Sequence, residues 1–275
     1  MDFRNILFPV DFSESCAAGV SYVKAMARLF DAPVFLLHVL ENAGSGPSEA
    51  RTNATRTLME MARISFEGLS AVPVIRQGDP AVEIAAFAEG RGVDLIMMPI
   101  HGAGRIREAL LGSVTAKVLS DSPCPVWTAA HPESKAPRAP GEIRSLLCAI
   151  DLSPESRALI RAADSLGART GAKVRLVHAV DGDETAPRTA MELDFEKYLK
   201  DCARVSIARL QQETGTAFDL CLQAGPPSRV VETVARHHEA DLVIAGRGKL
   251  QAYGGRLNTH AYSLIRDTPC AVLSF

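Results

Sequence analysis

The chain has 275 residues, of which 47% are hydrophobic and 23% are charged. This length suits two domains of ordinary size, and the composition is that of a globular protein rather than a disordered or fibrous one. A net charge of −2 and a single tryptophan argue against the basic, aromatic-rich surfaces that bind nucleic acids.

In the first half of the chain, short apolar segments alternate with longer amphipathic ones. The expected strands are 5–10, 33–39, 72–77, 93–98 and 125–128, and the expected helices are 15–30, 49–69, 80–90 and 106–121. Short, wholly apolar strands between amphipathic helices are typical of a parallel sheet that is covered on both faces. Right-handed crossovers then give a doubly wound α/β domain.

Four short patterns recur in the same order in the second half. They are Asp-x-Ser after a strand (Asp11, Asp151), His at a strand end (His38, His178), Asp before an apolar strand (Asp94, Asp241) and Ser/Thr-Pro-Cys before the last strand (Cys124, Cys270). Four matches at a nearly constant offset indicate an internal duplication.

A segment that is poor in structure-forming residues separates the two copies. Its prolines and glycine are Pro132, Pro137, Pro140 and Gly141. These residues cannot continue a helix or a central strand. We therefore expect domain 1 at 1–130, a linker at 131–142 and domain 2 at 143–275.

In doubly wound sheets, ligands bind beyond the carboxyl ends of the strands, where the strand order reverses. By this rule we expect Asp11, Val39 and the loop after Met98 to lie close together in the first copy. In the second copy it gathers Asp151 and Ala179 with the loop after the strand that ends near residue 245.

The segment 99–115 is rich in small residues and carries two arginines. The residues of interest are Gly102, Arg105, Arg107, Gly112 and Ser113. Small residues let backbone N–H groups approach an anion, and a helix N-terminus favours negative charge. The arginines are either phosphate contacts or a solvated helix face. The general phosphate-loop and dinucleotide fingerprints are absent, so the pattern alone indicates a small-ligand domain.

The order of these motifs in both copies resembles the universal stress protein family. The quoted residues are strand-Asp, strand-His, Asp-Leu-Ile, His-Gly, Leu-Gly-Ser-Val and Ser-Pro-Cys-Pro-Val. The resemblance implies a five-stranded parallel sheet of order 3-2-1-4-5 in each domain, with helices on both faces. It also implies an intramolecular pseudo-dimer, in which the final strands at 125–128 and 271–274 pair and so remove two exposed sheet edges.

ATP-binding members of that family carry Gly-x-x-Gly, then nine residues, then Gly-Ser or Gly-Thr. By this resemblance Gly102 and Gly112 are the second and third glycines, Ser113 is the hydroxyl residue and Val114 lies beside the phosphates. His101 precedes the second glycine; contact with a ligand and a plain surface role both stay open for it.

The resemblance also implies that Asp11 contacts the adenosine end of the ATP and that backbone groups of Val39 contact the adenine. The family's first glycine is Pro99 here. Proline lacks an N–H and fixes φ, so one contact to the ribose or a phosphate is lost or reshaped.

The second copy departs further from the family pattern. Gly246 and Gly248 form a loop that is one residue shorter, and Asn258-Thr259 replaces Gly-Ser. We expect domain 2 to bind ATP weakly or not at all. The alternative is that Arg247 and its neighbour Lys249 compensate electrostatically.

Structural roles are open for several of these residues. Asp11 and Asp151 suit the capping of a helix, which is the favoured reading for Asp151. His38 and His178 suit packed, hydrogen-bonded histidines. Cys124 and Cys270, like the other four cysteines, form no Cys-x-x-Cys pair, so buried reduced thiols are expected rather than a metal site.

Residues 1–5 lack the pattern of a signal peptide, and no apolar run approaches the roughly 18 residues of a membrane span. A cytoplasmic protein without metal or membrane contact is expected.

No nucleophile elbow, zinc-protease helix or carboxylate pair marks a dedicated enzyme. The leading hypothesis is a stress-response protein that binds ATP, with or without Mg²⁺, in domain 1. The alternatives are a scaffold acting through proteins or another small ligand and, more weakly, a slow ATPase. Association into a homodimer also stays open.

Overall fold

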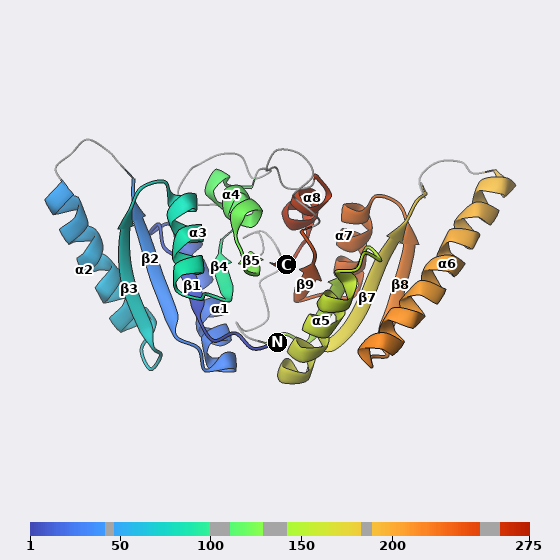
Figure 1. Ribbon diagram of the computed structural model, residues 1–275, viewed down its shortest axis with the longest axis horizontal. Helices are drawn as coiled ribbons and strands as arrows, with labels where there is room; N and C mark the ends of the chain where they lie inside the picture. The colour runs from blue at the N-terminus through green and yellow to red at the C-terminus, as the bar shows by residue number, and fades with distance from the viewer. Residues whose placement is uncertain (42–46, 100–110, 129–141, 183–188, 248–258) are drawn as a thin grey trace.

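The structure is a computed structural model that describes residues 1–41, 47–99, 111–128, 142–182, 189–247 and 259–275. Figure 1 shows two α/β halves side by side. The first half contains β1 (Ile6–Pro9), α1 (Glu14–Phe30), β2 (Val34–Leu40), α2 (Pro47–Ser65), β3 (Ala71–Gln77), α3 (Pro80–Gly90), β4 (Leu95–Met98), α4 (Ser113–Asp121) and β5 (Val126–Thr128). The second half contains β6 (Ser145–Ala149), α5 (Ser156–Thr170), β7 (Lys173–Val180), α6 (Ala190–Thr214), β8 (Asp219–Ala224), α7 (Pro227–His237), β9 (Leu242–Ala245), α8 (Thr259–Asp267) and β10 (Ala271–Ser274).

The strands form one sheet in the order β3-β2-β1-β4-β5-β10-β9-β6-β7-β8. Each half therefore has the predicted order 3-2-1-4-5, and within each half all strand pairs are parallel. The two halves meet where β5 pairs with β10 in the antiparallel direction, with Trp127 opposite Leu273. This is the pairing of final strands that the resemblance implied.

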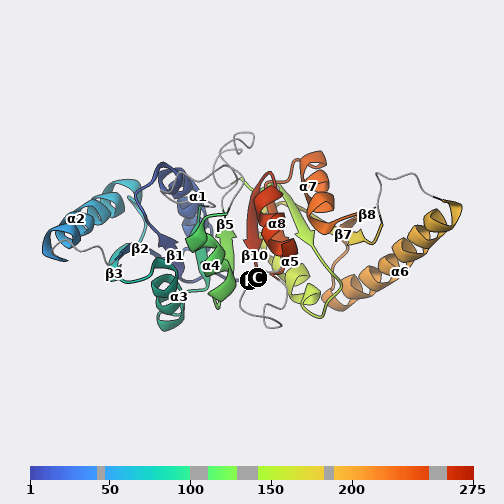
Figure 2. The same cartoon turned by 90° about the horizontal axis from the view of Figure 1, so that it is seen from above.

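Helices cover both faces of the sheet. Side chains from α1, α2, α5 and α6 pack in one apolar cluster, and side chains from α3, α4, α7 and α8 pack in another. Both clusters contain residues from both halves, so the core continues across the junction. Figure 2 shows α4 and α8 close to that junction.

The aspartate that precedes an apolar strand in both copies has the same structural role in each. Asp94 accepts hydrogen bonds from the backbone N–H groups of Arg4 (2.9 Å) and Asn5 (3.1 Å), just before β1. Asp241 accepts them from Arg144 (2.8 Å) and Ser145 (2.9 Å) at β6. The carboxylate thus satisfies the backbone at the start of the neighbouring central strand in both copies.

Two helix boundaries differ from the prediction. The helix expected at 49–69 ends at Ser65, because the chain reverses where Gly68 takes a φ of 77°. The helix expected at 106–121 begins only at Ser113, because Gly112 has a ψ of 141°, outside the helical region. The predicted linker at 131–142 lies almost wholly outside the described residues and stays a prediction.

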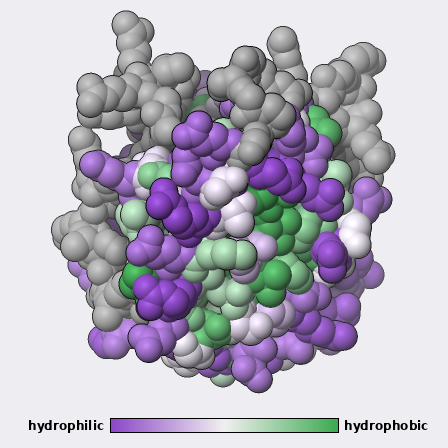
Figure 3. Space-filling model, turned by 90° about the vertical axis from the view of Figure 1, so that its left-hand side faces the viewer, coloured by the Kyte–Doolittle hydropathy of each residue, from purple (hydrophilic) through white to green (hydrophobic). Residues whose placement is uncertain are grey.

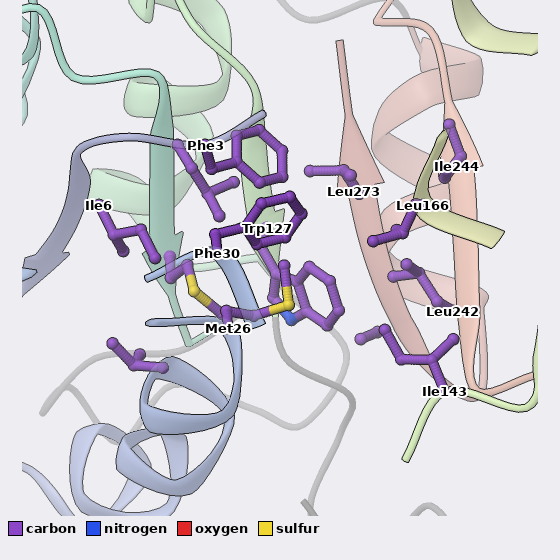
Figure 4. Packing of buried hydrophobic residues seen from close by; sticks show 14 of the residues in the cluster. Phe3, Ile6, Met26, Phe30, Trp127, Ile143, Leu166, Leu242, Ile244 and Leu273 are labelled. Carbon is purple, nitrogen blue, oxygen red and sulfur yellow. The ribbon is translucent and has the colours of Figure 1, made fainter. Parts of the chain in front are cut away.

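Large apolar side chains fill the junction between the halves (Figure 4). Phe3, Phe30 and Trp127 come from the first half, and Ile143, Leu166 and Leu273 come from the second. Arg169 of α5 lies over the Phe30 ring at 4.6 Å and donates to the Leu29 carbonyl at 3.2 Å. A cation from the second half therefore stabilises the C-terminus of α1.

Candidate functional site

The sheet brings three of the predicted site residues to one edge. β1 pairs with β2 on one side and with β4 on the other, so the carboxyl ends of these strands are neighbours. Asp11 follows β1, Val39 lies near the end of β2 and Pro99 follows β4. The strand order reverses between β1 and β4, which is where doubly wound domains hold their ligands.

Asp11 organises a strained turn at this edge. Its Oδ1 accepts hydrogen bonds from the Ser13 N–H at 3.0 Å and from the Ser13 hydroxyl at 2.6 Å. Between them, Phe12 has a φ of 61°, a left-handed conformation that costs a bulky residue about 1–2 kcal/mol. The Ser13 hydroxyl in turn accepts from the Cys16 N–H at 3.1 Å and so caps α1. Asp11 stays exposed, so capping and ligand contact are compatible.

The histidine at the end of β2 supports the same turn. His38 donates through Nδ1 to the Val10 carbonyl at 2.6 Å, and its ring lies 4.6 Å from that of Phe12. A carbonyl only accepts, so the neutral tautomer that carries the proton on Nδ1 satisfies this bond. The prediction of a packed, hydrogen-bonded histidine is confirmed.

Domain 2 repeats the arrangement. Asp151 Oδ1 accepts from the Ser153 N–H at 2.9 Å and from the buried Ser156 hydroxyl at 3.1 Å, and Leu152 has a φ of 64°. His178 donates to the Ile150 carbonyl at 2.8 Å. Burial raises the pKa of Asp151, but the hydrogen bonds from Ser153 and Ser156 outweigh it and hold the pKa below 3.8. Asp151 therefore supports the turn, but the capping role predicted for it is wrong, because the N-cap residue of α5 is Glu155 and the described residues give that helix no side-chain cap.

The N-terminus of α4 lies next to the end of β4. Thr115, 3% exposed, donates its hydroxyl proton to the Pro99 carbonyl at 3.2 Å and so ties the first turn of the helix to the strand. Gly112 is the N-cap residue, and no side chain of the described residues caps the helix there. Ser113 is exposed and Val114 is half-buried. The backbone N–H groups that open α4 are therefore suited to an anion.

The backbone conformation of Gly112 does not require glycine. Its φ of −57° and ψ of 141° are open to any L-residue. What glycine provides at this position is the absence of a side chain over the start of α4.

Domain 2 holds α4 at both of its ends. Tyr262 of α8 accepts, through its hydroxyl oxygen, the N–H of Leu111 at 3.1 Å, one residue before the N-cap. At the other end, the guanidinium of Arg247 donates to the carbonyls of Leu119 (2.8 Å), Ser122 (3.3 Å) and Cys124 (3.0 Å).

Arg247 therefore does not have the role that the sequence suggested. Its side chain is only 8% exposed and stabilises the C-terminus of α4. The part of the alternative that rests on Arg247 is wrong, because its guanidinium is directed into domain 1; the part that rests on Lys249 lies outside the described residues. The only signal for this role in the sequence is weak, namely that the last turn of α4 carries no basic residue of its own.

The remaining predicted site residues divide into three groups. Ala179 on β7 is half-buried and Gly246 is exposed directly after β9, so both lie at the equivalent edge of domain 2. Thr259 begins α8. The positions outside the described residues are His101, Gly102, Arg105, Arg107, Gly248, Lys249 and Asn258.

The burial predicted for Cys124 and Cys270 is confirmed, whereas Cys202 is exposed and Cys221 is half-buried. Cys124 and Cys270 are buried and unpaired, and burial raises the pKa of Cys270 to about 12. Within the described ranges, no group of three or more His, Cys, Asp or Glu side chains could hold a metal ion. No described helix is both long and apolar enough to cross a membrane.

Two doubly wound domains, joined through their last strands and each with an Asp-x-Ser turn at its ligand edge, define a duplicated α/β protein of one repeated unit. The model of the universal stress protein family matches residues 2–129 and again residues 142–274. The chain therefore belongs to the universal stress protein family.

A curated relative agrees with this assignment, and a solved structure shares the fold over nearly the whole chain. A universal stress protein of Methanocaldococcus jannaschii is 33% identical over 150 residues, which cover 45% of this chain and 93% of the relative. A crystal structure of a universal stress protein from Archaeoglobus fulgidus matches with a TM-score of 0.73 at 23% identity, covering 99% of this chain and 96% of that one. A universal stress protein from Archaeoglobus fulgidus in complex with dAMP matches 46% of this chain and 97% of its own, at 25% identity and a TM-score of 0.38.

Proposed function

We propose that this universal stress protein binds ATP in domain 1 as a regulatory ligand. The observation that carries the proposal is the N-terminus of α4, where Gly112 is the N-cap residue and the described residues give the first N–H groups no side-chain cap, next to the end of β4. An anion at this position meets several N–H groups and the positive end of the helix dipole.

The other residues of the same edge supply the rest of the site. Val39 lies at the carboxyl end of β2 and offers backbone groups to the adenine. Asp11, exposed on its turn, meets the adenosine end. The phosphates then extend toward Ser113 and Val114, and Mg²⁺ accompanies the nucleotide. His101, Gly102 and Arg105 are assigned to this site by the family pattern alone.

Domain 2 has a structural role in this proposal. It keeps the Asp151 turn, but the residue after Gly246 is Arg247, whose charge already serves the junction. In the sequence, Asn258 stands at the position that corresponds to Gly112 of domain 1. One nucleotide per chain is the expected stoichiometry, and a cytoplasmic location follows from the use of ATP as a ligand.

Affinity for ATP in the presence of Mg²⁺ tests the role of Gly112. Gly112→Ala keeps an allowed backbone but places a methyl group over the start of α4, so we expect at least a tenfold loss of affinity, about 1.4 kcal/mol. Gly90→Ala is the matched control, because a Cβ at Gly90 meets no atom within 4 Å. Equal affinity of wild type and Gly112→Ala would place the phosphates elsewhere.

A second candidate function is a scaffold whose nucleotide site has decayed. Pro99 favours it, because a proline at the end of β4 cannot donate the N–H that a glycine would offer. Native mass spectrometry of the purified protein separates the two functions. Co-purified adenine nucleotide supports the first, and a non-nucleotide ligand or none supports the second. Phosphate release above the buffer control would add a slow ATPase activity to the first.

A further inference from the structure

Helix α6 carries a stripe of exposed apolar side chains on its outer side. The helix packs on domain 2 through buried residues such as Ala203 and Ile207. On another side it exposes Met191 (79%), Phe195 (60%), Tyr198 (63%) and Val205 (72%), together with the exposed Cys202. Figure 1 shows α6 at the outer end of the molecule, far from the junction of the two halves.

The spacing of the stripe is that of a helix-pairing seam. Met191, Phe195, Tyr198, Cys202 and Val205 follow one another at intervals of four, three, four and three residues. This alternation keeps apolar side chains on one line along a helix and is the pattern that inserts into the gaps of a second helix. Single exposed apolar residues are ordinary, whereas a line of five over four turns is not.

The duplicated fold provides an internal comparison. Helix α2 holds the same place in domain 1, and its exposed large apolar residues are Met59 (56%) and Ile64 (55%). These two are five residues apart and so point in different directions around the helix. Figure 3 shows this end of the molecule, where apolar surface is interrupted by polar side chains. The fold therefore does not require the stripe on α6.

The area of the stripe suits a second copy of this chain. At roughly 150–250 Å² for a large side chain, the exposed fractions of Met191, Phe195, Tyr198 and Val205 leave about 500 Å² open to solvent. Two copies that cover this area from each other bury about 1,000 Å², which is the lower bound for a specific interface. Pairing of the same surface across a two-fold axis is also the commonest route to a homo-oligomer.

The flanking charges disfavour a lipid surface as the occupant. Helices that lie on membranes carry lysines and arginines beside their apolar face. Here the flanks carry Glu192, Asp194 and Asp201. Asp201 is paired with Arg204 at 2.5 Å, which reduces its repulsion from the same residue of a second copy.

We propose that α6 pairs with α6 of a second copy and thereby joins two chains into a dimer. The contact lies at the opposite end of domain 2 from the β5–β10 junction and does not depend on nucleotide. It extends the protein from two domains to four, with the domain 1 sites at the outer ends.

Sedimentation equilibrium of the full chain tests the proposal. We expect a concentration-dependent dimer with a micromolar dissociation constant, and a monomer for the double variant Phe195→Glu, Tyr198→Glu. The control variant is Met59→Glu, Ile64→Glu on α2, which should dimerise like the wild type. Both changed pairs are exposed, so circular dichroism should show an unchanged fold in each variant.

Three results would overturn the proposal. They are a wild-type monomer at high micromolar concentration, a dimer that persists in the α6 variant, and a dimer that is lost in the α2 control. A monomer that co-sediments with lipid vesicles would assign the stripe to a membrane surface instead.

Discussion

Replacing Arg247 with methionine tests whether domain 2 holds α4 in place. Methionine retains an apolar chain of similar length but removes three hydrogen bonds, to the carbonyls of Leu119, Ser122 and Cys124. The Cys124 carbonyl keeps the Ser122 hydroxyl as a donor at 3.0 Å. Each of the other two carbonyls, if left without a donor, costs about 1–3 kcal/mol, and entering water offsets part of this. We therefore expect Arg247→Met to lose about 3–5 kcal/mol of the free energy of unfolding.

Thermal or urea unfolding measures this loss. For a chain of this size, 1 kcal/mol shifts the melting temperature by about 2–4 °C, so a drop of roughly 6–20 °C is expected. Arg236→Met is the matched control, because Arg236 pairs with Glu232 on the surface of α7 with 63% of its side chain exposed. Such a pair contributes about 0–1 kcal/mol. A loss below about 1 kcal/mol in Arg247→Met would refute the account of the junction.

Three further predictions follow from the described contacts. Tyr262→Phe removes only the hydroxyl that accepts the Leu111 N–H. Hydrogen exchange at the Leu111 amide should therefore accelerate, and the affinity for ATP should fall severalfold. An unchanged exchange rate would show that the contact is dispensable. The ionised Asp151 carboxylate contributes stability that is present above its ordinary pKa of 3.8 and is lost as the pH falls through its lowered pKa in the folded state. Asp151→Asn should remove this contribution, so the stabilities of wild type and variant should differ at neutral pH and converge in acid. Acid unfolding curves measure this, and a difference that stays constant with pH would contradict it. Burial raises the pKa of the Cys16 thiol to about 11, so maleimide at mildly alkaline pH should label the exposed Cys202 well before Cys16. Mass spectrometry of the digested protein gives the order of labelling. Equal labelling of the two cysteines would contradict the burial of Cys16.

The sheet was predictable because its signals are local. Each central strand is a short apolar run, and each is followed or preceded by an aspartate whose structural role the duplication repeats, as at Asp94 and Asp241. The start of α4 was not predictable from propensity. Residues 106–111 continue a helical pattern, yet Leu111 and Gly112 lie outside the helix, where Leu111 gives its N–H to Tyr262.

The candidate site was predictable only in part. The strand ends placed Asp11 and Val39 correctly at one edge, because the strand order of this fold fixes which ends are neighbours. The turn at Phe12, with its positive φ, carries no sequence signal, since phenylalanine rarely adopts that conformation. The contacts of Arg247 with α4 cross between the domains, and only the packing of β5 against β10 brings those residues together.

Isothermal titration of the purified full chain with ATP and Mg²⁺ tests the central claim most directly, because it reports both affinity and stoichiometry. The account predicts one ATP per chain, since the start of α4 has glycine as its N-cap and no side-chain cap among the described residues, whereas the sequence of domain 2 has Asn258 at the equivalent position. Binding of two ATP molecules would contradict the structural role of domain 2. No heat of binding at high micromolar protein, with the fold intact, would contradict the nucleotide site itself.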